Sequence, residues 1–351
     1  MGPVWYRRKG VAGSIMKTDN ITLEHGNGGK MTKKLINDIF QVHFENSSGN
    51  FDEDAASLQI SGNTAFTTDS FVIRPLFFPG GDIGKLSVCG TVNDLLTAGA
   101  KPLYLSAGFV IEEGCSLDIL DKIAYSMRKA ADESGVSIVT GDTKVIERNS
   151  KEPGVIINTS GIGKIISPVS TKYAEPGDAL IVSGCIGDHE ACILSLRMGI
   201  QNKIRSDVSP LNELIFALIE NDITLHGIRD ITRGGLATVL GEISLLCGLG
   251  IEIAENQLPV GEGTFMLLKI LGMEPVYMAN EGKMLIIVPE NESIRALELI
   301  KRARYGENAA IIGHITEKKE NNNIPYVHML TKTGGFRALP PLSGESLPRI
   351  C

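Results

Sequence analysis

Two periods of hydrophobic residues run along this chain, and together they predict interleaved helices and strands. Apolar side chains recur every three or four positions at 120–131 and 236–246, a spacing that buries one face of a helix. Residues 83–100 are apolar on nearly every side, which predicts a fully buried helix. Further helices are predicted at 31–40, 188–198, 264–271 and 293–305, and from a Ser209 cap with Pro210 in the first turn. Strands are predicted at 21–24, 57–60, 64–68, 105–111, 136–140, 154–163, 179–182, 223–225, 251–254, 284–288 and 309–315.

The order of these elements predicts the fold class. Strands and helices mix without a strict strand–helix–strand period, so we expect an α+β protein rather than a doubly wound sheet. A length of 351 residues is enough for two domains with separate cores. The Pro-, Ser- and Thr-rich stretch 168–177 is the expected boundary. The predicted limits are 1–15 for an extension without structure, 16–167 for the first domain, 176–338 for the larger second domain and 339–351 for a flexible tail.

Composition narrows the class of protein. Hydrophobic residues make up 43% of the chain and charged residues 21%, which is typical of a globular protein. The net charge of -7 and the pI near 5.5 argue against a nucleic-acid binder and fit a cytoplasmic protein. No apolar run reaches the roughly 18 residues of a membrane span. None of the six cysteines forms a C-x-x-C pair, so we expect a reducing compartment and neither a disulfide framework nor a zinc site.

The chain ends on a cysteine, Cys351, with only its own carboxylate after the thiol. The preceding LPPLSGESLP is rich in Pro, Gly and Ser, which predicts an extended and mobile lead. A terminal thiol on such a lead can enter a narrow site that an internal residue cannot. Chance and function explain this ending equally well from spacing alone. A prenylation box does not fit, because it places its cysteine fourth from the end.

Five aspartates recur where strands end or glycines begin. Asp54 opens an Asp-Ala-Ala run, Asp69 closes a strand, and Asp142 follows a glycine. Asp230 precedes Thr-Arg-Gly-Gly, and Asp94 lies inside the buried helix, where an unpaired charge is costly. Each one alone is better explained as a turn or cap residue. The five together favour a magnesium–nucleotide site without a Walker loop, since Mg²⁺ takes few carboxylates and completes its shell with water and phosphate.

Glycine-rich turns are the second feature of such a site. His25-Gly-Asn-Gly-Gly29 opens a helix, so the backbone N–H groups around Gly28 and Gly29 can hold an anion. GGDIGKLS at 80–87 resembles a P-loop but has Leu after Lys85 where Ser or Thr should stand. Each glycine cluster alone is more often a plain turn.

Two charged residues add to this pattern. Lys144 follows Gly-Asp-Thr and would lie beside phosphates if Asp142 does. Glu281-Gly282 stands directly before a predicted strand. A surface charge and a turn residue are equally good explanations for the two.

Four runs carry a specific resemblance to a known family. They are FTTDSFVIRPLFFPGGDIGKLSVCGTVNDLLTAGA at 66–100, IVTGDTKV at 138–145, DITRGGLATVLGEI at 230–243 and the terminal PRIC. From about Met16 to Cys351 the chain resembles the HypE family of hydrogenase maturation proteins, within the aminoimidazole ribonucleotide synthetase and selenophosphate synthetase superfamily. The PRIC ending is the most specific of the four, because the related synthetases do not end on cysteine.

The resemblance implies an architecture and a reaction. It implies an aminoimidazole ribonucleotide synthetase-like pair of α+β domains with ATP between them, and a homodimer formed through the first domain's sheet. It implies that HypF carbamoylates the terminal thiol and that this chain uses ATP to dehydrate the thiocarboxamide to a thiocyanate. The cyano group would then pass to iron on the HypC–HypD complex during nickel–iron hydrogenase assembly.

The residues singled out above fit that chemistry. The expected Mg²⁺ ligands are Asp54, Asp69, Asp94 and Asp142. The expected ATP contacts are Gly28, Gly29, Asp69, Lys85, Asn93, Gly141, Thr143 and Arg233. Cys351 would carry the carbamoyl group, Lys144 would stabilise phosphate charge, and Glu281 is the expected base for the amide proton. Arg349 is expected to favour the thiolate. Two alternatives stay open: a small-molecule synthetase of the same superfamily, and an ATP-sensing scaffold without net ATP consumption.

Overall fold

The computed structural model describes residues 20–44, 55–149, 151–317 and 326–340 of the chain. Its N-terminal sheet has four strands in the order β1-β6-β4-β5. Only β4 and β5 run parallel. The strands are β1 (Thr64–Phe71), β4 (Ala100–Glu112), β5 (Ser137–Ile146) and β6 (Val155–Ile165).

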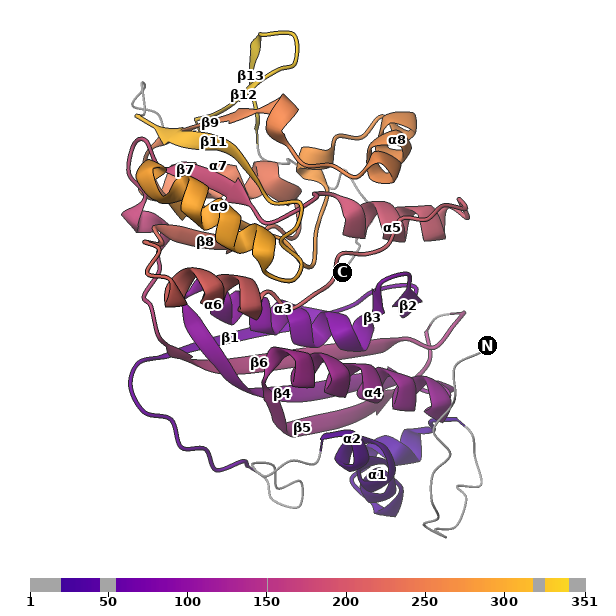
Figure 1. The fold of residues 1–351 in the computed structure, drawn as a ribbon. Helices are drawn as coiled ribbons and strands as arrows, with labels where there is room; N and C mark the ends of the chain where they lie inside the picture. The colour runs from indigo at the N-terminus through magenta and orange to yellow at the C-terminus, as the bar shows by residue number, and fades with distance from the viewer. Residues whose placement is uncertain (1–19, 45–54, 150, 318–325, 341–351) are drawn as a thin grey trace.

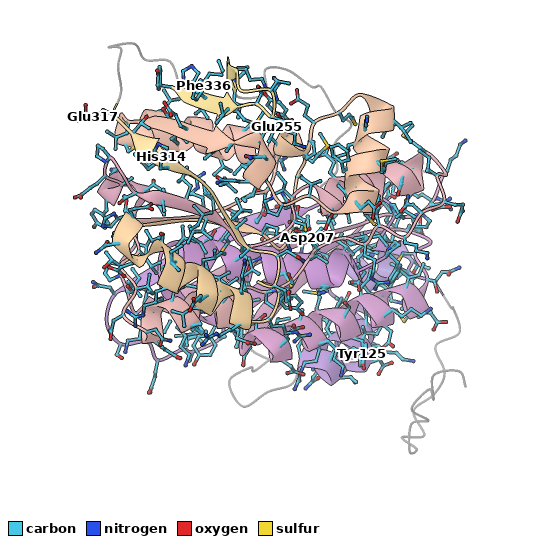
Figure 2. The ribbon with its side chains drawn as sticks, turned by 45° about the horizontal axis from the view of Figure 1, so that its top comes forward. Tyr125, Asp207, Glu255, His314, Glu317 and Phe336 are labelled. Carbon is cyan, nitrogen blue, oxygen red and sulfur yellow. The ribbon has the colours of Figure 1, made fainter. Side chains whose placement is uncertain are left out.

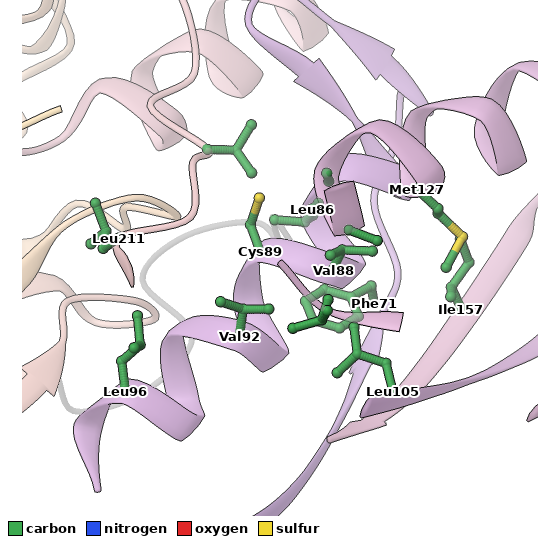
Figure 3. Packing of buried hydrophobic residues seen from close by; sticks show 14 of the residues in the cluster. Phe71, Leu86, Val88, Cys89, Val92, Leu96, Leu105, Met127, Ile157 and Leu211 are labelled. Atoms are coloured by element: carbon green, nitrogen blue, oxygen red, sulfur yellow. The ribbon is translucent and has the colours of Figure 1, made fainter. Parts of the chain in front are cut away.

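Two helices, α3 (Ile83–Thr97) and α4 (Leu117–Ser134), cover one face of this sheet (Figure 1). Helix α4 begins at Leu117, three residues before the predicted apolar face, because the Ser116 hydroxyl accepts the Asp118 N–H at 3.2 Å and caps the helix. It ends at Gly135, whose φ of 69° suits glycine. Figure 3 shows Met127 of α4 beside the sheet residue Ile157, within the same apolar cluster as Val88 and Val92 of α3.

The glycine-rich turn lies within a helical segment beside β5, between η1 (Leu23–Gly26) and α1 (Lys30–Leu35). This segment comprises η1, α1, η2 (Ile36–Gln41) and α2 (Val42–Phe44), and both η1 and α2 contact β5. Between β1 and α3 lie the short strands β2 (Phe77–Phe78) and β3 (Gly81–Asp82). The opposite edge strand of the sheet is β1.

The C-terminal sheet has seven strands in the order β13-β12-β9-β11-β7-β10-β8. All neighbours are antiparallel except β12 and β9. The strands are β7 (Ala179–Val182), β8 (Gly227–Asp230), β9 (Gly250–Ala254), β10 (Met284–Val288), β11 (Ala310–Thr316), β12 (Val327–Leu330) and β13 (Phe336–Ala338). The helices are α5 (Asp188–Arg197), α6 (Asn212–Glu220), α7 (Gly235–Cys247), α8 (Glu262–Leu271) and α9 (Ser293–Arg302), and the short helices are η3 (Thr171–Tyr173), η4 (Glu255–Gln257), η5 (Pro275–Tyr277) and η6 (Glu290–Glu292).

One buried apolar cluster runs through both halves. It joins α3 and the N-terminal sheet to α6, α9 and one face of the C-terminal sheet. Helix α7 covers the other face and belongs to a second cluster. In Figure 1, α6 and α9 lie between the C-terminal sheet and α3. The two sheets are thus held in one packed unit, which fixes the residues at their junction.

Several predicted elements are wrong in detail. Residues 21–24 lead into η1 rather than a strand, and 57–60 form no strand, so β1 pairs with the distant β6 instead of a local hairpin partner. Strand β5 continues through 141–146 because β4 offers a partner along its whole length. Ser209 is not a cap: its hydroxyl binds the Asp207 carbonyl, and α6 begins at Asn212.

Two further errors concern the C-terminal sheet. The strand predicted at 223–225 is absent, and β8 occupies 227–230 instead, paired with β10. The last predicted strand, 309–315, does not end the sheet either, because β12 and β13 extend it and Leu339 is buried. The last described residue is Pro340.

Candidate functional site

Three of the predicted aspartates meet at the junction of the two halves. Asp69 comes from β1, Asp94 from the buried helix α3 and Asp230 from the end of β8. They converge because α3 packs against β1 on one side and β8 on the other. The Thr67 hydroxyl donates to Asp94 Oδ2 at 2.9 Å. We call Asp69, Asp94 and Asp230 the acidic cluster.

The acidic cluster is electrostatically strained. Burial is the main cause that raises the pKa of Asp94 to about 7, and the negative charges of Asp230 and Asp69 add to it. Burial likewise raises the pKa of Asp230 and of Asp69 above their ordinary values. Three partly buried carboxylates without a matching cation repel one another. A divalent cation would relieve that repulsion, so the donor set fits Mg²⁺.

Two arginines border the acidic cluster. Arg229 lowers the pKa of Asp230 and of Asp94, but its guanidinium also binds Glu242 at 2.5 Å. Arg233 lowers the pKa of Asp69 and is exposed just before α7. Within the described residues, no three acidic, histidine or cysteine side chains converge closely enough to hold a metal alone. Phosphate oxygens and water would have to complete the shell of a magnesium ion, as is usual for it.

A second group of predicted residues lines a cavity of about 170 Å³ at the β5 edge. Its floor is apolar, formed by Phe40, Phe44 and Phe109 among others. Asp142 accepts the Thr143 N–H at 2.8 Å and the Lys144 ammonium at 3.3 Å. The predicted residues that line this cavity are Gly28, Gly141, Asp142, Thr143 and Lys144.

The acidic cluster and this cavity lie on opposite edges of the N-terminal sheet. One row of the sheet runs from Asp69 through Thr159 and Ala107 to Gly141. Three strand spacings separate the ends of that row, which is about 14 Å. Asp142 therefore does not join Asp69 and Asp94 around one ion within a single chain.

Glu281 lies in a third place, on the loop before β10. Its side chain is buried, and its backbone N–H donates to Asp207 Oδ1 at 3.0 Å. The Gly282 N–H donates to the other oxygen of the same carboxylate at 3.3 Å. Lys283 Nζ stands 3.4 Å from that oxygen. We call this arrangement of Asp207 with residues 281–283 the clamp.

Three residues predicted to contact the nucleotide neither belong to the acidic cluster nor line the cavity at β5. Lys85 lies near the start of α3, where its ammonium donates to the Gly80 carbonyl at 3.4 Å, more than two helical turns from Asp94. Asn93 is buried and binds backbone groups of Ser209 and Leu211. Gly29 caps α1 and does not line the cavity. Asn93 thus joins α3 to the C-terminal half.

Some predicted residues are not described by the structure, and some residues at the site were not predicted. Asp54, Arg349 and Cys351 lie outside the described residues. Sequence reasoning missed Arg229 and Asp207. Arg229 directly precedes the predicted Asp230 and could have been found from that neighbour. Asp207 carries no local signal, because the backbone N–H groups that its carboxylate binds are more than 70 residues away.

The comparisons with known proteins agree with the sequence resemblance. Models of AIR synthase related proteins match residues 52–165 with their N-terminal domain and 175–323 with their C-terminal domain. The chain is 41% identical over 345 residues to carbamoyl dehydratase HypE of Rhodobacter capsulatus, covering 96% of this chain and 99% of that protein. It is 40% identical over 344 residues to the Escherichia coli K12 enzyme of the same name, covering 95% and 100%. The chain belongs to the HypE family.

Solved HypE structures share its fold. A HypE crystal structure in complex with ATP superposes with a TM-score of 0.89 at 44% identity, covering 94% of this chain and 99% of that one. The HypE chain of a HypE–HypF complex gives a TM-score of 0.76 at 46% identity, covering 88% and 99%. The predicted two-domain, synthetase-like α+β fold is therefore confirmed. No helix in the described ranges is long and apolar enough to cross a membrane.

Proposed function

We propose that this chain is an ATP-dependent carbamoyl dehydratase of hydrogenase maturation, whose substrate is a carbamoyl group on its own Cys351. Its relatives bear that name, and one of them binds ATP in a crystal structure. The products would be an S-cyano group on Cys351, ADP and phosphate. The cyano group would serve as the precursor of a ligand to iron.

The position of the last described residue is the observation that carries this proposal. The Tyr277 hydroxyl donates to the Pro340 carbonyl at 3.1 Å, so the chain leaves the core beside η5. Tyr277 is only four residues before Glu281. The eleven residues from 341 to Cys351 span up to about 38 Å when extended. The terminal sulfur could therefore reach any group within that distance of Pro340, and we propose that Glu281 and the acidic cluster are among them.

The reaction assigns a separate task to each group. The carbamoyl oxygen attacks the γ-phosphorus of ATP, ADP leaves, and the oxygen becomes part of a good leaving group. Glu281 takes a proton from the amide nitrogen. The carbon–oxygen bond then breaks, phosphate departs, and loss of the second N–H proton completes the nitrile. Lys144 lies on the opposite edge of the sheet from the acidic cluster, so it would stabilise the negative charge on the transferred phosphoryl group across the dimer interface proposed below.

The acidic cluster would hold magnesium. Asp69 and Asp94 are its proposed ligands, together with Asp230, which the sequence analysis left out of the ligand set. When bound, Mg²⁺ would neutralise charge on the phosphates. Arg233 is close enough to lower the pKa of Asp69, so it is placed to contact phosphate there.

A homodimer through the N-terminal sheet would unite the two edges of that sheet. The face away from α3 and α4 has Phe66 71% exposed, in register with the half-buried Ile162 and Tyr104. Exposed apolar residues in a row mark an interaction surface. In an isologous dimer, Asp142 and Lys144 of one protomer could approach the acidic cluster of its partner. We expect Phe66→Glu to sediment as a monomer in analytical ultracentrifugation, and a dimer of unchanged affinity would contradict this interface.

The remaining parts of the proposal follow the family. HypF would supply the carbamoyl group, since a relative is crystallised in a HypE–HypF complex. The HypC–HypD complex would accept the cyano group, and the reaction would take place in the cytoplasm. We keep 16–167 as the limits of the first domain, but extend the second domain from 338 to 340, because Leu339 is buried and Pro340 accepts a hydrogen bond from Tyr277.

Intact-mass spectrometry tests the function. Full-length protein, first carbamoylated by its HypF partner, is incubated with MgATP. We expect the C-terminal peptide to lose one water, and Cys351→Ala to acquire neither modification. ATP turnover with an unmodified C-terminal peptide would instead identify a small-molecule synthetase. ATP binding without consumption would identify a nucleotide-sensing scaffold.

A further inference from the structure

The loop that carries Glu281 is held by a buried carboxylate from another part of the chain. Asp207 has a side chain only 4% exposed, and its two oxygens accept the adjacent backbone N–H groups of Glu281 and Gly282. Two N–H bonds to one carboxylate fix the orientation of the intervening peptide. The direction of the Glu281 side chain depends on that orientation.

Close packing at Gly282 is a second observation that joins the same two segments. A methyl group added at Gly282 would overlap the backbone oxygen of Asp207 and the Ser209 hydroxyl. The two segments therefore touch backbone to backbone, and only glycine fits between them. Lys283 completes the arrangement: its ammonium donates to the Gly282 carbonyl at 2.8 Å and pairs with Asp207.

The segment that bears Asp207 is itself fastened to the N-terminal half. The Ser206 N–H donates to the Pro79 carbonyl at 2.8 Å. Asn93 on α3 binds the Ser209 carbonyl and the Leu211 N–H, both at 3.0 Å. Asn93 directly precedes Asp94 of the acidic cluster. Figure 2 shows Asp207 between the purple N-terminal elements and the orange C-terminal ones.

We propose that Asp207 is a positioning residue for the dehydration step: its carboxylate holds the backbone of Glu281 and Gly282 so that Glu281 faces the carbamoyl group beside the nucleotide. The segment from Ser206 to Leu211 thereby ties the base to the helix that bears Asp94. This inference rests on the proposed role of Glu281 and deepens it. Lys283 neutralises the buried carboxylate and is not itself required to hold the two N–H groups.

The test compares Asp207→Asn with a matched variant. The full-length chain, carbamoylated by its HypF partner, is mixed with MgATP, and the single-turnover rate and the half-saturating ATP concentration are measured. We expect the rate to fall about 10- to 100-fold while half-saturation changes less than about twofold, since a small misplacement of a catalytic group slows chemistry without weakening binding. Asp178→Asn is the control, because the Asp178 side chain is about as buried as that of Asp207. Its carboxylate accepts the Glu175 N–H and contacts the His226 ring, and it does not bind the loop of Glu281.

Two results would overturn the inference. One is an Asp207→Asn rate that matches the control at equal folded fraction. The other is recovery of the rate in the Asp207→Asn/Lys283→Met double variant, which would mean that an unpaired lysine, rather than the lost hold on the loop, caused the defect. If Asp207→Asn does not fold, amide hydrogen exchange of the wild-type protein tests the inference instead. We expect the amides of residues 281 and 282 to be protected by their bonds to Asp207. Exchange as fast as that of an open loop would refute the inference.

Failure of this inference is distinguishable from failure of the proposed function. If Glu281→Gln is inactive while Asp207→Asn turns over normally, only the positioning role is lost. If Glu281→Gln turns over at the wild-type rate, the assigned base is wrong and the positioning role falls with it.

Discussion

The acidic cluster and the clamp both contain carboxylates at the junction of the two halves, but they differ in how far hydrogen-bond donors and positive charges of the protein stabilise those carboxylates. In the clamp, Asp207 has two backbone N–H donors and a lysine within 3.4 Å. In the acidic cluster, Asp94 has one hydroxyl donor and two negative neighbours that raise its pKa. The negative charge of Asp207 is thus balanced by groups of the protein itself, whereas the acidic cluster needs a bound cation to balance its charge.

This difference separates the two kinds of work at the site. A carboxylate whose hydrogen bonds are all made within the protein can hold a backbone in one conformation. A carboxylate whose charge the protein does not balance can still bind a cation, and it makes the cation-free fold less stable. The comparison therefore predicts that substitutions in the clamp region affect rate, and that those in the acidic cluster affect metal dependence and stability.

The largest expected effect is at Glu281, the residue that the clamp holds. Glu281→Gln keeps the size of the side chain but removes the base, so we expect the single-turnover rate of dehydration to fall about 10²- to 10⁴-fold. ATP binding should stay unchanged, because Glu281 is assigned to the amide and not to the nucleotide. Rapid-quench mass spectrometry of the carbamoylated chain gives the rate.

Glu290→Gln is the matched control for this prediction. Glu290 is exposed at the other end of β10, so its substitution should leave the rate within about twofold of wild type. Equal rates in both variants would remove the functional distinction between the clamp and the surface around it.

The sequence predicted the acidic cluster better than it predicted the clamp. Asp94 was identified because a charge inside an apolar helix is visible in the pattern itself, and the structure brings it to Asp69 and Asp230. The clamp joins Asp207 to Glu281 across 74 residues, and no periodicity records such a contact. Asp142 was assigned to the same ion as Asp69, but the order of strands places them on opposite edges of the sheet.

The fold shows the same division between local and long-range information. Helices α3, α4 and α7 and strands β7 and β10 were predicted almost at their observed limits, because each has a continuous apolar pattern. Strand pairing depends on distant partners, so the strand predicted at 57–60 is absent and β1 pairs with β6. The short strands β12 and β13 were missed, since three or four residues carry too little pattern to be recognised.

An intermediate effect is expected at Asp94, and it concerns stability. Its pKa of about 7 lies above the value of 3.8 for an unperturbed carboxyl group, so the folded state binds the proton more tightly than the unfolded state does. Stability without metal therefore decreases as pH rises from about 4 to 7 and stays reduced above that window. Asp94→Asn removes this penalty, and we expect the metal-free protein to gain about 1–3 kcal/mol at pH 8.

Urea unfolding at pH 4 and pH 8 measures this change. The gain should be present at pH 8 and small at pH 4, where the carboxyl group is protonated in the folded state and only about half ionised in the unfolded state. The same variant should lose the stabilisation that Mg²⁺ with ATP gives to the wild-type protein. A variant less stable than wild type at pH 8 without metal would show that the acidic cluster is satisfied like the clamp.

The smallest expected effect concerns the one hydroxyl that donates to the Asp94 carboxylate. Thr67→Val keeps the shape of the side chain but removes the bond to Asp94 Oδ2, which favours the charged form. The pKa of Asp94 should rise further, so protons compete better with Mg²⁺ at neutral pH. We expect the Mg²⁺ concentration for half-maximal turnover to increase about three- to tenfold.

Thr97 offers the matched control on the same aspartate. Its hydroxyl donates at 2.7 Å to the backbone carbonyl of Asp94 and not to the carboxylate. Thr97→Val should therefore leave the Mg²⁺ requirement unchanged, even if it destabilises the end of α3. Because a bound proton and a bound cation exclude each other at Asp94, the Thr67→Val shift should also shrink as pH is raised towards 9. A shift that is independent of pH, or that is equal in both variants, would mean that the magnesium requirement arises elsewhere than at Asp94.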